Sequence, residues 1–241
     1  MARLGSLAAF EEALSTRGAW VAGLDFPFTQ PRKFLRNAGW PEPWPDHADH
    51  LSAMTRAAFV TTLLDDKARR PAGDKEHPRG FEVGTGAASP MKLSGVPVGL
   101  MHHAGVPPLR RSGAHVPGLV DGDRSRMVLE AYPGVAARAL IGAKPYKTDE
   151  AARNTPGRLD ARRAILVALT GQDGRDRFGL VVNAPPTLAD DPSGDDLDAL
   201  LCAVQAAWGC RLLARGGLDG LDLSEGWIAD PAILPRLARL A

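Results

Sequence analysis

Acidic residues stand at three separate places in the 241-residue chain where their chemistry could be used: Asp25 follows an apolar run, Glu130 closes another, and Asp195 with Asp198 heads an apolar helical pattern. Carboxylate oxygens are the ligands that Mg²⁺ and Mn²⁺ prefer. Two such ions about 4 Å apart can activate an attacking water and stabilise a leaving alkoxide. This chemistry suits phosphodiester hydrolysis. We therefore take all four acids as candidate catalytic residues, and Asp25, Asp195 and Asp198 as candidate metal ligands.

Each acid also has a purely structural explanation. Asp195 and Asp198 lie three residues apart, so they stand side by side on a helix, where they either favour the helix dipole or hold a cation between them. Asp25 could instead bond the backbone amides of the Phe-Pro-Phe turn that follows it. Glu130 in a buried strand needs a partner, and Lys144 or Lys147 could form that ion pair. The residue types leave both explanations open.

The patterns around these acids predict the elements that hold them. Residues 19–28 form an apolar run without alternation, which predicts a strand covered on both faces. Asp25 then lies at its C-terminal end, the edge where open α/β sheets bind ligands. A second buried strand is predicted over 126–132, and apolar residues at three- and four-residue steps predict a helix over 194–209, capped by Ser193 or Asp195. Further helices are predicted over residues 7–16, 51–68, 135–141, 159–170 and 231–240, with a short closing strand within 221–228.

Other motifs are weaker. His47 and His50 resemble a metal spacing, but the sequence offers no third ligand, and a polar helix entry is favoured over zinc. Gly84-Thr85-Gly86 lacks the Gly-Lys-Ser/Thr ending of a phosphate loop. The adjacent His102 and His103 would point to opposite sides of an extended chain, which favours surface or packing roles. No Ser/His/Asp order and no cysteine nucleophile motif competes with metal-dependent hydrolysis.

Composition restricts the class of protein only in part. The 29 Lys and Arg against 28 Asp and Glu give a net charge of +1, which neither indicates nor excludes a nucleic-acid partner. Two cysteines are too few for a disulfide framework and fit a reducing, cytoplasmic setting. No apolar run approaches about 18 residues, so no membrane span is expected. We expect one domain over 1–241, with a Gly-, Pro- and Arg-rich insertion at about 65–126 that begins as a long mobile surface loop.

Five short phrases occur in order along the chain: Gly23–Phe28, Leu129–Pro133, Tyr146-Lys147, Asp198–Ala203 and Glu225–Ile228. Together they resemble the domain-of-unknown-function family 429 (DUF429), regarded as predicted nucleases of RNase H-like fold, over about residues 20–228. The resemblance implies an α/β fold with a mixed central sheet flanked by helices, with Mg²⁺ or Mn²⁺ as the expected cofactor and DNA or RNA as a possible partner; the substrate, whether DNA, RNA, a junction or a small phosphodiester, is left open. It equates Asp25 with the acid on the fourth strand, and Asp195 and Asp198 with the paired acids of the last helix. Glu130 belongs to the family's Glu-x-Tyr-Pro phrase.

The chain departs from this pattern at its start. RNase H-like enzymes begin with three antiparallel strands, of which the first supplies an aspartate to the metals, whereas here only a helix is predicted before the Asp25 strand. We therefore expect the N-terminal strands to be absent from this chain and one sheet edge to be exposed. The leading prediction is a metal-dependent nuclease. The alternative is a catalytically inactive module of that fold that binds nucleic acid or protein. The sequence carries no signal for an oligomeric state.

Overall fold

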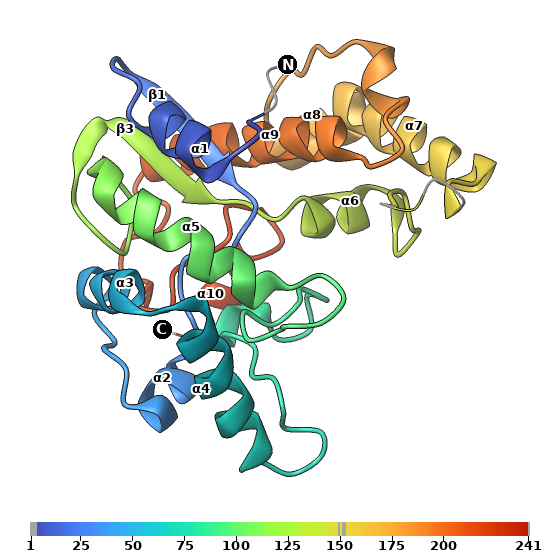
Figure 1. Ribbon diagram of the computed structural model, residues 1–241. Helices are drawn as coiled ribbons and strands as arrows, with labels where there is room; N and C mark the ends of the chain where they lie inside the picture. The colour runs from blue at the N-terminus through green and yellow to red at the C-terminus, as the bar shows by residue number, and fades with distance from the viewer. Residues whose placement is uncertain (1–3, 149, 151–152, 241) are drawn as a thin grey trace.

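The computed structural model describes residues 4–148, 150 and 153–240 and contains a small parallel sheet surrounded by helices (Figure 1). Strand β1 (Trp20–Leu24) pairs with β3 (Asp123–Glu130), with Leu24 opposite Glu130. The short β2 (Ala114–His115) pairs in parallel with the other side of β3, so the strand order is β1-β3-β2. The expected mixed sheet is thus corrected to a parallel one in the described residues, where antiparallel pairing is confined to one isolated bridge.

The C-terminal half of β3 is covered on both faces, as its apolar run predicted, whereas the prediction is wrong for the edge strand β1, which is only partly buried and exposes Val21 by 38%. Val128 of β3 packs into one core cluster and its neighbour Leu129 into another, because successive side chains of a strand point to opposite faces. β1 forms one edge of the sheet and is preceded by α1 (Leu7–Leu14), whose first turn is capped by the Ser6 hydroxyl. Asp25 directly follows β1, which confirms its predicted place at the strand's C-terminal end.

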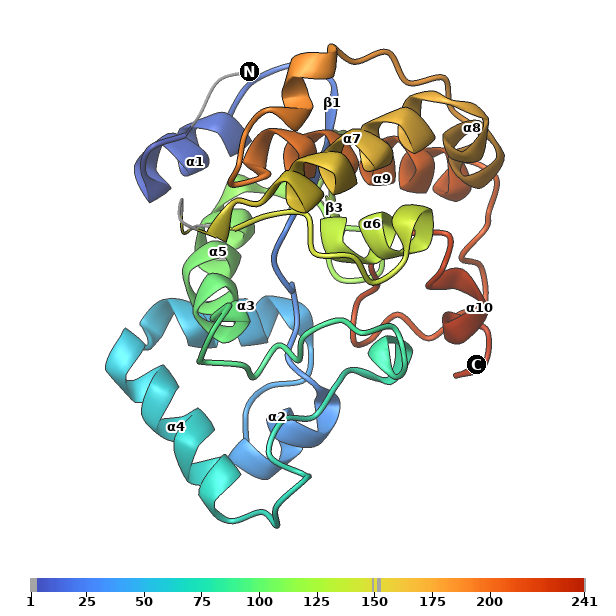
Figure 2. The ribbon, with the colours of Figure 1, turned by 90° about the vertical axis from the view of Figure 1, so that its right-hand side faces the viewer.

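One helical layer packs on β1 and β3 through the long helix α9 (Asp195–Leu213). Around α9 lie α6 (Pro133–Ile141), α7 (Pro156–Thr170) and α8 (Gln172–Phe178), with the short η3 (Pro186–Ala189) leading into it (Figure 2). These helices enclose an aliphatic core, and the predicted helices at 135–141, 159–170 and 194–209 are confirmed in type and place.

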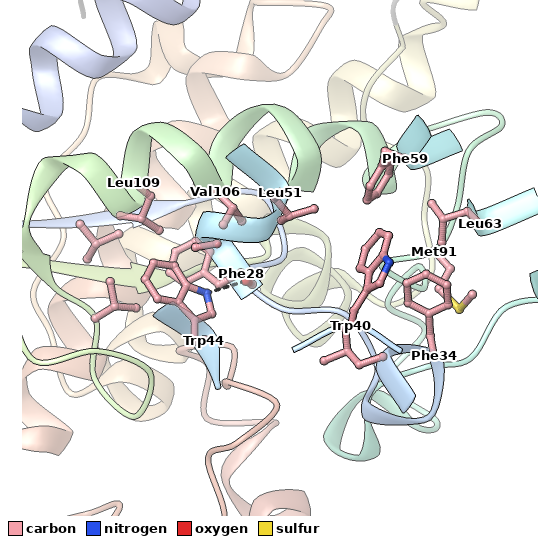
Figure 3. Packing of buried hydrophobic residues seen from close by; sticks show 14 of the residues in the cluster. Phe28, Phe34, Trp40, Trp44, Leu51, Phe59, Leu63, Met91, Val106 and Leu109 are labelled. Carbon is pink, nitrogen blue, oxygen red and sulfur yellow. Dashed lines mark hydrogen bonds between the residues drawn. The ribbon is translucent and has the colours of Figure 1, made fainter. Parts of the chain in front are cut away.

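The opposite layer is built on α5 (Val98–Ser112), which contacts α1, α3 (Trp44–Ala53) and α4 (Arg56–Ala68); α2 (Arg32–Ala38) packs against α4. An aromatic core fills this layer, and its labelled members are drawn in Figure 3. The Trp44 indole donates a hydrogen bond to the Phe28 carbonyl at 2.8 Å (Figure 3). This bond ties the turn after β1 to α3.

Several segments differ from the sequence prediction. The helix expected over 51–68 is two helices, because the chain turns at Met54 and the Thr55 hydroxyl caps α4. Helix α5 was not predicted, since Pro107 and Pro108 and its glycines are typical of loops, yet its buried face overrides that propensity. The prediction of a surface loop within 65–89 is wrong for the middle of this segment, because the 3₁₀ helix η1 (Gly80–Glu82) lies there and is largely buried.

The C-terminal segment is also less regular than predicted. The closing strand is reduced to a single parallel bridge between Ile228 and Glu130, and the tail helix to α10 (Leu234–Leu237). Within the described ranges, none of the helices has the length and hydropathy needed to cross a membrane.

The contact between β1 and α9 generates a stability prediction. A Cβ added to Gly23 would lie 2.3 Å from the Cys202 backbone oxygen, which cannot move without shifting α9. We expect Gly23→Ala to lower the free energy of unfolding by about 1–3 kcal/mol in urea titrations. Gly157→Ala is the control, because its nearest neighbour is 4.0 Å away and alanine favours the first turn of α7. A Gly23→Ala protein as stable as wild type would contradict this packing.

Candidate functional site

A cavity of about 330 Å³ lies where β1 and β3 end. The parallel pairing of Leu24 with Glu130 brings the residues after both strands to one edge of the sheet. The cavity wall combines acids, bases and two tyrosines with apolar side chains; its polar members are Asp25, Arg79, Glu82, Lys92, Glu130, Tyr132, Tyr146 and Lys147. Two of the four acids predicted from the sequence, Asp25 and Glu130, therefore line one cavity.

Asp25 is a half-buried carboxylate in this wall. Burial raises its pKa to about 6, the negative charges of Asp198 and Glu130 add to this rise, and the Lys147 ammonium opposes it. The structural explanation for Asp25, bonding the amides of the following turn, fails at Phe28, whose N–H donates to Glu130 instead. No group among residues 4–148, 150 and 153–240 donates a hydrogen bond to the Asp25 carboxylate. The Asp25 carboxylate is therefore an ionisable group in the cavity wall without a structural hydrogen bond from the described residues.

Asp198 lies behind the wall, in the first turn of α9, and is buried. The Tyr146 hydroxyl donates to its Oδ1 at 2.7 Å, and the Lys147 ammonium donates to its Oδ2 at 2.5 Å. Burial raises the pKa of Asp198, while Lys147 and Tyr146 act against that rise. Burial also disfavours the charge of Lys147, but Asp198 outweighs this and raises the pKa of Lys147, so the ammonium stays charged at neutral pH.

Asp195 is exposed on the same turn and does not line the cavity. Gly194 with a positive φ is the helix N-cap, in place of the predicted Ser193 or Asp195, and the Ser193 hydroxyl accepts from the Asp195 N–H at 3.3 Å. The charge of Asp195 still contributes to the raised pKa values of Lys147 and Asp198. In the described part of the chain, no three His, Cys, Asp or Glu side chains are grouped closely enough to hold a metal ion. The charge of Asp198 thus acts directly on the pKa of Asp25, whereas Asp195 lies outside the cavity.

Glu130 has a different partner from the lysines predicted for it. The fully buried Arg79 donates from Nη1 to Glu130 Oε2 at 2.8 Å and bonds Oε1 through Nη2, which also reaches Glu82 at 2.6 Å. Glu130 Oε2 also accepts from the Phe28 N–H at 2.9 Å. Burial works against the charge of Arg79, but the two glutamates outweigh it and raise its pKa. Glu130 therefore fixes the turn that carries Asp25.

The histidines singled out in the sequence lie behind this turn. His47 is buried in α3, not at a polar helix entry, and its Nε2 lies 3.1 Å from Nε2 of His102. His102 Nδ1 donates to the Pro27 carbonyl at 2.8 Å, which confirms a packing role for His102. Burial and the charge of His50 lower the pKa of His47 to about 4, so this ring is neutral at pH 7. The pair supports the turn and forms no metal group with other described residues.

The comparison with known families covers part of the site. The family model described as "Protein of unknown function (DUF429)" matches residues 107–214, slightly less than half of the chain. The chain is thus similar to that family from the second half of α5 to the end of α9. Glu130, Tyr146, Lys147 and Asp198 lie inside the matched region, whereas Asp25 and Arg79 lie outside it. No curated protein and no solved structure matches the chain.

The raised pKa of Asp25 predicts how stability depends on pH. The pKa of Asp25 is about 6 in the folded protein against 3.8 for an ordinary aspartate, so the folded state binds the proton more tightly and loses stability as pH rises between these values. We expect Asp25→Asn to stabilise the protein by roughly 3 kcal/mol at pH 7.5 and by about 1 kcal/mol at pH 4.5 in urea titrations. The exposed Asp160→Asn is the control, with changes within about 0.5 kcal/mol. Equal stability of Asp25→Asn and wild type at both pH values would refute the shift.

The buried pairs of Arg79 predict a large loss of stability. Arg79→Met would leave Glu82 and Glu130 buried without a counter-charge, which costs about 3–5 kcal/mol. Adding Glu130→Gln to this variant should recover part of the loss in a double-mutant cycle. The control is Arg124→Met, because Arg124 pairs with Asp121 at the surface, where such pairs contribute at most about 1 kcal/mol. Similar losses for both arginine variants would count against the buried ion group.

Proposed function

We propose that the chain is a divalent-metal-dependent phosphodiester hydrolase, a nuclease, with Asp25 at its centre. One observation carries the proposal: the Asp25 carboxylate lines a cavity at the C-terminal edge of a parallel sheet, has a raised pKa, and accepts no hydrogen bond from the described residues. Strongly perturbed acids in such places are characteristic of functional sites. A structural carboxylate of this burial would be expected to have donors.

The charges around Asp25 favour an added cation. They form two groups, in each of which two acids share one base: Glu82 and Glu130 with Arg79, and Asp25 and Asp198 with Lys147. Each group has one more negative charge than positive. A cation near Asp25 would offset the repulsion that raises its pKa.

The donor set fits Mg²⁺ or Mn²⁺ bound together with substrate. Mg²⁺ commonly uses one or two carboxylates, several waters and the phosphates of its substrate. Asp25 would supply the direct carboxylate ligand, with the charge of Asp198 in support, and a cage of three carboxylates is not needed. When bound, such an ion neutralises phosphate charge and activates water for attack on phosphorus. The predicted role of Asp195 as a ligand remains a proposal.

The chain's own side chains would position the phosphodiester. Lys147 keeps its charge at neutral pH and lines the cavity with Lys92, so both can contact non-bridging phosphate oxygens. Tyr146 and Lys147 hold Asp198 in one orientation. In hydrolysis, the water oxygen bonds to phosphorus and the water gives up one proton to solvent, the bond from phosphorus to the leaving oxygen breaks, and the leaving oxygen takes up one proton from solvent. Arg79 and Glu130 are positioning residues, since they hold the Asp25 turn.

A second candidate function is a non-catalytic module that binds nucleic acid. It is favoured by Asp198, whose two oxygens are already engaged by Tyr146 and Lys147. In this case the Asp25 cavity would bind a phosphate without cleaving it. Metal binding and cleavage must therefore be measured separately.

Mn²⁺ calorimetry on the full chain tests the proposal. We expect wild type and Asp160→Asn to bind Mn²⁺ at pH 7.5, and Asp25→Asn to bind it at least about tenfold more weakly. Since protons compete for a carboxylate with a pKa of about 6, wild-type affinity should fall about fourfold at pH 5.5. Equal binding by Asp25→Asn and wild type would refute the metal site.

Cleavage separates the two candidates. Labelled DNA and RNA oligonucleotides incubated with Mn²⁺ should be cut by wild type and by Asp160→Asn, and not by Asp25→Asn. If Mn²⁺ binding depends on Asp25 and no oligonucleotide is cut, the non-catalytic module is the better description.

A further inference from the structure

A second hollow of about 320 Å³ adjoins the Asp25 cavity. The two share Gly134, Tyr146 and Lys147, so they adjoin at the Lys147 side chain. The second hollow runs along the C-terminal half of α6 and the segment 142–147 that follows it. We call it the basic groove. Figure 2 shows α6 and this segment beside α7 and α9.

The charges of the basic groove are all positive. Arg138, Lys144 and Lys147 line it, and its lining residues include no Asp or Glu. Lys144 is exposed, and within the described residues its ammonium has neither an ion pair nor a hydrogen bond. Arg138 donates to the Thr85 carbonyl at 2.8 Å, an interaction that leaves its charge unbalanced. Lys147 is paired with Asp198, so the cations of the groove without an acidic partner in the described residues are Arg138 and Lys144.

Helix capping does not account for these charges. A cation in the last turn of a helix is favoured by the helix dipole, and this explains Arg138. Lys147 is explained by its ion pair with Asp198, but Lys144 lies beyond the end of α6 at Ile141, where the dipole no longer acts. The backbone there is also open, because no atom lies within 4 Å of a Cβ built on Gly142. A ligand chain can approach the main chain at that point.

We propose that the basic groove binds the phosphates that flank the reacting phosphodiester, so that the substrate is a nucleic-acid strand and not a small phosphodiester. The inference rests on the proposed function of the Asp25 cavity. A substrate with one phosphate would need only Asp25, Lys92 and Lys147. Arg138 and Lys144 continue outward from the cavity without acidic partners in the described residues, and such cations serve a ligand that leaves the cavity carrying further negative charges at regular spacing. Lys and Arg contacts of this kind set the affinity for a nucleic-acid backbone without reading its sequence.

Charge reversal at Lys144 tests the groove without disturbing a described contact. Arg56→Glu is the matched control, because it makes the same change in net charge at an exposed position on α4, away from α6 in both views (Figures 1 and 2). Binding of fluorescein-labelled 12-nucleotide DNA and RNA strands is measured by anisotropy in EDTA, where cleavage cannot occur. We expect Lys144→Glu to bind at least about fivefold more weakly, with a salt dependence reduced by about one phosphate contact. Arg56→Glu should stay within about twofold of wild type.

Three results would refute the proposal that the groove binds a nucleic-acid strand. The first is that wild type binds neither strand, and the second is that both variants lose the same affinity for the strands. The third is that polyglutamate displaces the labelled strand as well as an unlabelled strand does. The last result would identify a site for acidic polymers in general. A difference between the DNA and RNA arms identifies the sugar that the groove accepts.

A small substrate separates this inference from the proposed function. With Mn²⁺ and bis(4-nitrophenyl) phosphate, Lys144→Glu should retain wild-type hydrolysis while its cleavage of the 12-nucleotide strand falls at least about fivefold. If binding of the oligonucleotide depends on Lys144 and neither substrate is hydrolysed, the binding role of the groove is supported and the proposed hydrolase function is refuted. Hydrolysis of both substrates at wild-type rates by Lys144→Glu would refute the groove and support the hydrolase.

Discussion

The buried guanidinium of Arg79 is the constraint on which the site depends. It joins Glu82 of its own segment to Glu130 at the end of β3, and Glu130 in turn accepts the Phe28 N–H of the turn after β1. The segment of Arg79, the end of β3 and the turn after β1, which are far apart in sequence, are therefore joined through the Arg79 guanidinium. Both terminal nitrogens of this guanidinium donate to buried carboxylates, whereas its Nε has no partner in the described residues, so the two glutamates fix its orientation. The position of Asp25 follows from it.

The two layers of helices meet the site in different ways. Helix α9 presses against β1 closely enough to require Gly23, and it carries Asp198 in its first turn. The opposite layer reaches the same turn through His102 and Trp44, which bond the carbonyls of Pro27 and Phe28. The Asp25 turn is thus held from both faces of the sheet. Rigid support of this kind suits a group whose ionised form is destabilised by its surroundings.

The sequence predicted the parts of the site that depend on local patterns. Residues 19–28 and 126–132 identified β1 and β3, and the register then placed Asp25 and Glu130 at one edge. Helix α5 was not predicted because Pro107 and Pro108 disfavour a helix locally, whereas burial of the apolar face of α5 stabilises the helix in the folded protein. Arg79 was not predicted as part of the site because Glu130, the partner that links it to the Asp25 turn, lies 51 residues away, and no local pattern encodes such a pair. Phe81 was the available signal, an aromatic residue inside a charged segment.

The parallel pairing of β1 with β3 has a consequence for folding kinetics. Leu24 and Asp123, which bound these neighbouring strands, are separated by nearly a hundred residues that include α2, α3, α4 and α5. Closing so long a loop costs entropy that only the finished packing returns. We expect the helical segment to become compact before β1 and β3 join. The Asp25 cavity would then be among the last features of the protein to form and among the first lost when the sheet opens.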